Sequence, residues 1–210
     1  MYRENIFVHI PRTGGTTVHK VLDKYASAVP DHVTAIEARM NWPSYFCYTF
    51  MRNPYTRMVS CYESQFPRRL NHYHLPKEPV SLTFERYVYI ITNNSEYGKV
   101  WDLHWIPQTD FILDDDDRLI VDYIGHTETL EKDINEIGRL IGAGVIVTPS
   151  VKKGFEPKPS YMELDKFDIV VKNKSDWRYP QNYRQYFNDD TRKKVEKYYE
   201  KDIEFLKVKF

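Results

Sequence analysis

Short apolar runs alternate along this chain with longer stretches whose apolar residues are widely spaced. Runs at residues 6–10 and 45–51 are rich in β-prone side chains, which predicts strands. Each run breaks into a polar loop, and the apolar positions that follow recur at helical spacing, which predicts helices from Thr16 and from Pro54. A third run at 119–124 predicts a late strand. Strands that alternate with helices are typical of a parallel sheet with ligand sites beyond the carboxyl ends of its strands.

The same periodicity predicts three later helices. One lies at 82–91, and another, at 130–141, is ended by Gly142–Gly144; a final helix is capped by Asp189–Thr191 and reaches Leu206. The predicted loops are residues 67–79 and 148–160. We therefore expect one domain over residues 1–210, with a three-layer, P-loop-like α/β fold in which helices flank a central parallel sheet.

Charge and composition narrow the class of protein. Lys and Arg together number 30, as do Asp and Glu, so no global basic field indicates a nucleic-acid partner. No stretch approaches the roughly 18 apolar residues of a membrane span, and the start of the chain does not resemble a signal peptide. Cys47 and Cys61 are too few for a disulfide scaffold and are expected as buried free thiols. Together with a native-looking Met1, these features favour a soluble, cytoplasmic protein.

The loop after the first apolar run has the composition of an anion site. Its glycines let the backbone approach a phosphate closely, its threonines offer hydroxyl groups, and its arginine offers a fixed fork of N–H donors. The predicted anion ligands are the consecutive residues Arg12, Thr13, Gly14, Gly15, Thr16 and Thr17. The loop matches neither the mononucleotide P-loop nor the dinucleotide glycine pattern. The alternative is an ordinary tight turn with a threonine cap.

A second loop of similar design follows the run at 45–51. Arg52 lies at the mouth of the helix that follows, Ser60 lies eight residues later within that helix, and Arg57 lies between them. Arg52 and Ser60 could hold one phosphate from the side, because a helix N-terminus favours anions. The alternative is a surface turn with solvated arginines. Two such loops indicate one ligand with two separate anionic groups.

Taken together, the two loops strongly resemble the cofactor motifs of sulfotransferases. The matching segments are residues 9–17, His-Ile-Pro-Arg-Thr-Gly-Gly-Thr-Thr, and residues 52–60, Arg-Asn-Pro-Tyr-Thr-Arg-Met-Val-Ser. Segments 103–108, 122–133 and 198–205 extend the resemblance over most of the chain. The carbohydrate, Golgi-type sulfotransferases are the group that the chain resembles most.

This resemblance implies the donor 3′-phosphoadenosine 5′-phosphosulfate (PAPS) and an acceptor hydroxyl, that of a carbohydrate, with no metal. The 5′-phosphosulfate would rest on residues 12–17, and the 3′-phosphate would be held by Arg52 and Ser60. Where the family usually has lysine, this chain has Arg12. Because arginine does not lose its proton, Arg12 can stabilise the leaving phosphate by charge and hydrogen bonds but cannot protonate it.

Sulfuryl transfer to an alcohol also needs a base, and histidine suits this role because its unperturbed pKa of about 6.5 lies close to working pH. His32 is the first candidate, since related glycan sulfotransferases place a base between the two motifs; the alternative is a surface histidine in a polar turn. His104 is the second candidate, with Trp105 and Gln108 beside it along an acceptor groove. The alternative there is a tryptophan packed in the core. His9 and His19 are expected to be structural. 

Three further clusters carry weaker signals. His72 and His74 could bind a metal, but no third ligand completes a set, so no metal is assigned. The acidic run 114–117 could bind a divalent cation, although a solvated loop is the favoured interpretation. Lys152–Lys153 could close over a nucleotide, contact an anionic acceptor or lie in a solvated loop.

Two rival functions remain at this stage. A nucleotide kinase-like phosphotransferase would need Mg²⁺ and a carboxylate near the phosphates, and neither loop contains a carboxylate. A catalytically silent nucleotide- or glycan-binding protein would keep the fold and the donor site without transfer. The replacement of lysine by Arg12 keeps this second rival open.

Overall fold

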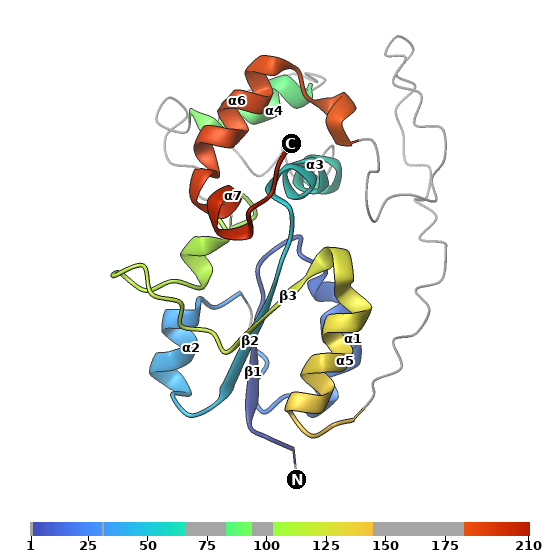
Figure 1. Cartoon of the computed structure of the whole chain (residues 1–210), viewed down its shortest axis with the longest axis vertical. Helices are drawn as coiled ribbons and strands as arrows, with labels where there is room; N and C mark the ends of the chain where they lie inside the picture. The colour runs from blue at the N-terminus through green and yellow to red at the C-terminus, as the bar shows by residue number, and fades with distance from the viewer. Residues whose placement is uncertain (1, 31, 66–82, 94–102, 145–182) are drawn as a thin grey trace.

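The structure is a computed structural model, and it describes residues 2–30, 32–65, 83–93, 103–144 and 183–210 (Figure 1). The described strands are β1 (Asn5–Val8), β2 (Phe46–Met51) and β3 (Tyr123–His126). They form a parallel sheet in the order β1-β2-β3. The register pairs Val8 with Thr49 and Met51 with His126, so the described strands end at one edge of the sheet.

Helices cover both faces of this sheet. The described α-helices are α1 (Gly15–Leu22), α2 (Ala35–Asn41), α3 (Pro54–Gln65), α4 (Phe84–Thr92), α5 (Leu130–Leu140), α6 (Asp189–Tyr198) and α7 (Glu200–Leu206). Short 3-10 turns occur at η1 (Asp23–Tyr25), η3 (Thr109–Phe111), η4 (Thr127–Thr129) and η5 (Tyr183–Tyr186). In Figure 1, α2 lies on one side of the sheet, α1 and α5 lie on the other, and α3, α4, α6 and α7 gather beyond the carboxyl ends of the strands.

Alternation along the strands explains these layers, since successive side chains of a strand point to opposite faces. On one face Ile6, Val8 and Met51 pack in a cluster with Ala35 and Ala38 of α2. The opposite face has a second cluster, made of strand residues Phe7, Tyr48 and Phe50 and helix residues Val18, Val21, Ile134 and Ile137. The apolar strand runs are therefore buried on both faces, as a parallel sheet requires.

The third cluster is helical and rich in aromatic side chains. Residues of α3, α4 and α6 meet there, among them Tyr55, Phe84 and Val195. The C-terminal Phe210 packs edge-on against Tyr55, with ring centroids 5.0 Å apart. This cluster fixes α3, which carries the second predicted anion loop, against the C-terminal helices.

Two predicted elements lie elsewhere than expected. The late strand is residues 123–126 rather than 119–124, because Leu119 forms an isolated antiparallel bridge with Leu113 before the chain joins the sheet. The final helix is two helices, interrupted at Tyr199, and its cap is Asn188, whose side chain accepts from Thr191 N. The other predicted helices and the Gly142–Gly144 ending are confirmed, while the loops 67–79 and 148–160 lie outside the described residues.

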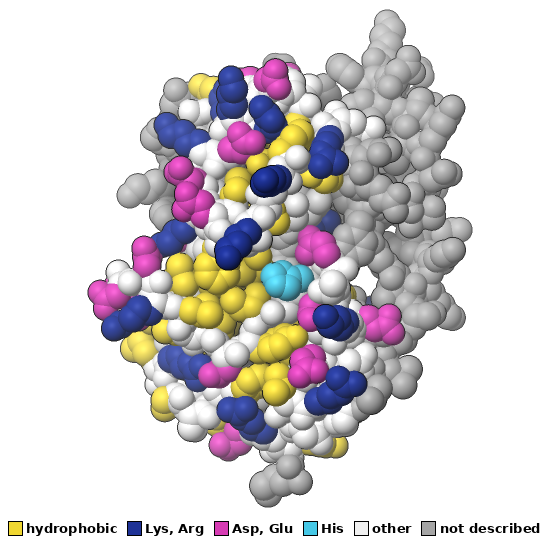
Figure 2. All heavy atoms as spheres, viewed as in Figure 1, with side chains coloured by type: hydrophobic (Ala, Val, Ile, Leu, Met, Phe, Trp, Pro, Cys, Tyr) yellow, Lys and Arg dark blue, Asp and Glu magenta, His cyan; other side chains and the backbone are white. Residues whose placement is uncertain are grey.

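The surface carries mixed charge. On the face shown in Figure 2, Lys and Arg side chains are interspersed with Asp and Glu, and hydrophobic side chains gather in the middle. This face therefore presents no continuous basic field. Within the described ranges, no helix combines the length and the apolar character that a membrane crossing requires.

Candidate active site

The two predicted anion loops meet at the carboxyl edge of the sheet. The guanidinium of Arg52, directly after β2, donates from Nη1 to the carbonyl oxygen of Arg12 at 3.3 Å. Thr127, directly after β3, lies between the same loops, with its hydroxyl 2.8 Å from the Thr13 carbonyl and 3.1 Å from the Met51 carbonyl. The ends of all three described strands are thus joined by side-chain hydrogen bonds to backbone carbonyls.

The first loop enters helix α1 through two glycines with different constraints. Gly14 has φ 93°, a left-handed conformation that favours glycine. A Cβ on Gly15 would lie 1.9 Å from Nε2 of His9, so this position admits no side chain while the ring stays in place. Thr17 N donates to Gly14 O, whereas the amides of Gly15 and Thr16 precede any possible intrahelical acceptor. The start of α1 therefore offers backbone donors to an anion.

The Thr13 hydroxyl already has a partner within this loop. The Thr13 hydroxyl donates to Ile10 O at 2.8 Å, and Thr13 is fully buried. This hydroxyl therefore closes the turn, and the assignment of Thr13 as an anion ligand stays a prediction. The hydroxyls that remain for an anion belong to Thr16, which is exposed, and Thr17, which is half-buried.

Arg12 bridges the two loops by its side chain as well as its backbone. Its Nε and Nη2 donate to the Ser60 hydroxyl at 3.1 and 2.9 Å. The sequence had assigned these two residues to separate anionic groups, and the structure instead brings them into contact. The backbone of Arg12 has φ 70°, which is uncommon for a residue with a Cβ and is typical of functional loops.

The arginines of the second loop are buried, so the alternative of a surface turn with solvated arginines is wrong. Arg52 is 5% exposed and also donates from Nε to the Thr56 hydroxyl at 3.0 Å. Arg57 is 2% exposed and donates to the carbonyls of Pro11 at 3.0 Å and Ile106 at 2.9 Å. Within the described residues, its Nη2 has no hydrogen-bond partner. Buried guanidinium charge directly behind the first loop makes this edge of the sheet favourable for anions.

Segment 103–108 does not supply the groove that was expected. Gln108 is fully buried and pairs with the backbone of Arg52, so its place in an acceptor groove is wrong. Trp105 is 5% exposed and donates from Nε1 to the Tyr87 hydroxyl at 3.0 Å, which confirms the core alternative. His104 is half-buried, and its ring lies near that of His32.

The two candidate bases lie close together. The ring centroid of His32 is 6.5 Å from that of His104 and 4.5 Å from that of His9. Nδ1 of His32 lies 3.3 Å from His9 O. Because a carbonyl can only accept, Nδ1 carries the hydrogen, and the lone pair of the neutral ring is on Nε2. His32 also has φ 44°, so both leading catalytic candidates, Arg12 and His32, have left-handed backbones.

His9 and His19 extend this group of histidines beneath the first loop. Nε2 of His19 lies 3.2 Å from Nδ1 of His9, and Nδ1 of His19 lies 2.9 Å from a carboxylate oxygen of Asp23. Burial, followed by the neighbouring His32, His19 and His104, lowers the pKa of His9 to about 3. His9 is therefore neutral at working pH, in line with the structural role expected for it.

Sequence reasoning missed two functional positions. Thr127 follows a strand end at the carboxyl edge, and that placement was the available signal. Asp202, which holds Gln108, has no local signal because its partners lie in a distant segment. The acidic run 114–117 forms a surface turn paired with Arg118 and Lys201, as the solvated-loop interpretation expects.

His72, His74 and Lys152–Lys153 lie outside the described residues. Among the residues that are described, no group of three or more His, Cys, Asp or Glu side chains could hold a metal ion.

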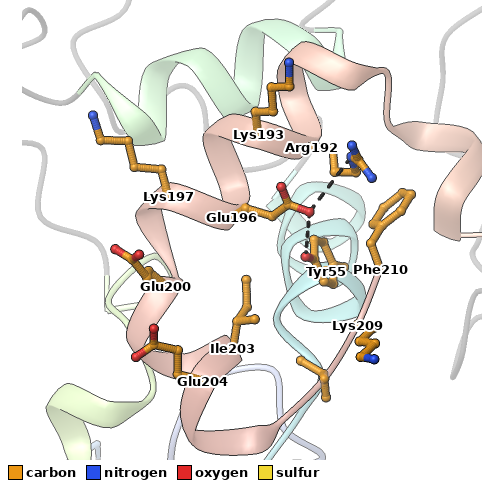
Figure 3. A pocket seen from close by; sticks show the side chains of 11 residues that line it. Tyr55, Arg192, Lys193, Glu196, Lys197, Glu200, Ile203, Glu204, Lys209 and Phe210 are labelled. Carbon is orange, nitrogen blue, oxygen red and sulfur yellow. Dashed lines mark hydrogen bonds and ion pairs between the residues drawn. The ribbon is translucent and has the colours of Figure 1, made fainter.

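A separate surface groove of about 670 Å³ lies between α6, α7 and the C-terminal residues (Figure 3). Its centre is Glu196, which accepts from the Tyr55 hydroxyl at 3.1 Å and lies 3.9 Å from Arg192 Nε. Basic and acidic side chains are mixed along this groove, so its charge does not select a ligand of one sign. We therefore place the candidate site at the loop edge.

The comparisons with known proteins agree with this arrangement. A family model described as the sulfotransferase family matches residues 4–208, which is nearly the whole chain. No curated protein and no solved structure matches it. The parallel sheet, its flanking helices and the two anion loops are consistent with a P-loop-like α/β fold. On the strength of the match over residues 4–208, this chain belongs to the sulfotransferase family.

Proposed function

We propose that this protein transfers a sulfuryl group from PAPS to an acceptor hydroxyl, that of a carbohydrate. Family membership supports sulfuryl transfer in general, and the geometry of the loop edge supports a donor with two anionic groups. The observation that carries the proposal is the buried guanidinium of Arg52, held against the first loop through Arg12 O at 3.3 Å. A nucleotide with phosphates at both its 5′ and 3′ positions fits two adjoining cationic loops.

The residues present divide between the two ends of such a donor. The amides of Gly15 and Thr16, with the Thr17 hydroxyl, would hold the 5′ end at the start of α1. Arg52 and Ser60 would hold the 3′-phosphate. Arg12 is the first residue of the first loop and also contacts Ser60, so its charge would lie near both ends of the donor.

When bound, PAPS would supply a sulfuryl group attached to a phosphate that leaves as a weak base. Arg12 would stabilise the charge that develops on this leaving phosphate, and it keeps its own proton throughout. His32 would accept the proton of the acceptor hydroxyl on Nε2, because Nδ1 is already committed to His9 O. His104 lies near enough to be the second candidate for this role.

The wider setting completes the proposal. We propose one catalytic domain over residues 1–210 that works in the cytoplasm without a metal. Both Cys47 and Cys61 are buried free thiols, which suits a reducing compartment. The two rivals, a Mg²⁺-dependent kinase-like enzyme and a catalytically silent nucleotide- or glycan-binding protein of the same fold, make different predictions about binding and transfer.

Calorimetric titration tests the donor site directly. Wild type should bind 3′-phosphoadenosine 5′-phosphate tightly and adenosine 5′-phosphate much more weakly. Arg52→Ala should remove that preference, because it deletes the buried cation that would face the 3′-phosphate. Arg118→Ala is a matched control, since Arg118 pairs with Asp114 and Asp116 on the surface, and it should leave both affinities unchanged. Equal affinity of wild type for the two nucleotides would refute the proposed donor.

A further inference from the structure

A chain of buried polar groups runs from helix α7 to the backbone of Arg52. Asp202 and Gln108 are both fully buried. The Asp202 Oδ2 atom accepts from Gln108 N at 2.8 Å and from Gln108 Nε2 at 3.3 Å. The Gln108 side chain then accepts from Arg52 N through Oε1 at 2.8 Å and donates through Nε2 to Arg52 O at 2.8 Å. One amide side chain thus pairs with both polar backbone atoms of Arg52.

The Arg52 backbone and the carboxylate both require the same orientation of this amide, since Arg52 N can only donate and Arg52 O can only accept. Asp202 Oδ1 accepts from the backbone and the hydroxyl of Thr109, each at 2.9 Å, so its hydrogen bonds come from Gln108 and Thr109. An ionised carboxylate has no hydrogen to donate, so the Gln108 atom that faces it has to be the NH₂ group. Oε1 is then left to face Arg52 N. Reversal of the amide would set two acceptors against each other at Arg52 O and at Asp202.

A buried carboxylate is costly to desolvate, and an apolar side chain would fill the same space without that cost. The place of Asp202 behind Gln108 and Arg52 suggests that it stabilises the backbone of Arg52. Arg52 is the first residue after β2, where the sheet no longer fixes the backbone. Gln108 replaces that constraint, while Thr56 and the Arg12 carbonyl hold the guanidinium at 3.0 and 3.3 Å. Figure 1 shows α7, which carries Asp202, beside α3 beyond the sheet.

We propose that Gln108 and Asp202 are positioning residues for the 3′-phosphate site, acting through the backbone of Arg52. The inference rests on the proposed donor site, and it assigns to a C-terminal helix a role in selecting 3′-phosphorylated nucleotides. Neither residue touches the nucleotide. Their contribution is a guanidinium already oriented before binding, which reduces the ordering cost of association.

The test compares two variants that each remove one buried side-chain hydrogen bond to Asp202. Gln108→Met removes both side-chain hydrogen bonds to the Arg52 backbone and keeps a side chain of similar length. Thr109→Val removes the hydroxyl bond to Asp202 Oδ1 and leaves the hydrogen bonds between Gln108 and Arg52 in place. Each variant is titrated with 3′-phosphoadenosine 5′-phosphate and with adenosine 5′-phosphate, and its thermal unfolding is recorded.

We expect Gln108→Met to weaken binding of the 3′-phosphorylated nucleotide about tenfold, because a misaligned Arg52 would lose about one hydrogen bond to the charged phosphate. The affinity for adenosine 5′-phosphate should change less than about twofold, within the ordinary spread of neutral contacts. Thr109→Val should lower the unfolding temperature yet keep the wild-type ratio of affinities. If Gln108→Met does not fold, Gln108→Asn replaces it, because its amide is one methylene shorter and cannot bond Asp202 and both backbone atoms of Arg52 together.

Two results would overturn the inference. In one, the variants that disturb Gln108 keep the wild-type ratio of affinities. In the other, Thr109→Val lowers that ratio as much as Gln108→Met, which would indicate a general loss of stability. Failure of the donor proposal itself is distinguishable, since wild type would then show no preference for the 3′-phosphorylated nucleotide.

Discussion

Replacement of Gly15 by alanine tests the packing beneath the first loop. The added Cβ would lie 1.9, 2.3 and 2.6 Å from Nε2, Cδ2 and Cε1 of His9. Carbon atoms in contact are ordinarily about 3.5–4.0 Å apart, so the ring must move. The ring has little room to do so. The ring centroids of Phe7 and His32 lie 5.4 and 4.5 Å from that of His9, and Nε2 of His19 lies 3.2 Å from Nδ1 of His9.

The magnitude follows from two opposing effects. Overpacking of a filled site costs about 1–3 kcal/mol, while alanine in place of glycine in a helix returns about 0.5–1 kcal/mol. We expect a net loss of about 1–2 kcal/mol in the free energy of unfolding, which corresponds to roughly 2–8 °C in unfolding temperature for a chain of this size. Differential scanning calorimetry of Gly15→Ala measures it.

A double-mutant cycle with His9→Ala shows whether the collision is the cause. Removal of the ring removes the clash, so Gly15→Ala should cost at least about 1 kcal/mol less in the His9→Ala background than in wild type. Additive effects of the two substitutions, or a rise in unfolding temperature for Gly15→Ala alone, would refute the reasoning.

Three further predictions concern the same edge of the sheet. Thr127→Val removes the hydroxyl that bonds the carbonyls of Thr13 and Met51; it should lower the free energy of unfolding in urea by about 1–2 kcal/mol, and an unchanged midpoint would contradict this. The pKa of His9 is about 3 in the fold against 6.5 for the free side chain; the unfolded chain therefore takes up the proton first, stability falls as pH drops below 6.5, and His9→Ala should show a shallower fall in unfolding temperature. Equal slopes for the two proteins would count against a buried neutral ring. His32→Asn should lower kcat about 10²–10⁴-fold while the affinity for 3′-phosphoadenosine 5′-phosphate stays the same; retention of full kcat would move the base to another residue.

The sequence predicts that the two loops meet at one edge of the sheet, because the signals for each strand, turn and helix lie within a few neighbouring residues. An apolar run followed by a polar loop and helical spacing indicates a strand, a turn and a helix. Two such units in a parallel sheet must bring their loops to one edge. The hydrogen bond from Arg52 to the Arg12 carbonyl shows that the two loops do meet there. The capping box formed by Thr34 and Glu37 is an equally local signal, and it marks the start of helix α2, which the apolar periodicity does not predict.

Features that depend on distant partners could not be predicted in the same way. The run 119–124 is apolar because Val121 packs in the cluster on the α2 face, although it lies before the strand. The hydroxyl of Thr13 could face a ligand or the backbone, and only the folded turn decides. Gln108 depends on Asp202, which lies 94 residues further along the chain. No local pattern specifies which of many buried acceptors a glutamine will meet.

The central claim is transfer of a sulfuryl group from PAPS, and label transfer tests it most directly. Wild type is incubated with PAPS carrying a radioactive sulfur and with a pool of glycans bearing free hydroxyls, in the presence and absence of Mg²⁺. We expect label to move to glycan without Mg²⁺, and to stop moving in Arg12→Ala. Label that stays on a nucleotide that the protein nevertheless binds would contradict the account and favour a silent nucleotide-binding protein.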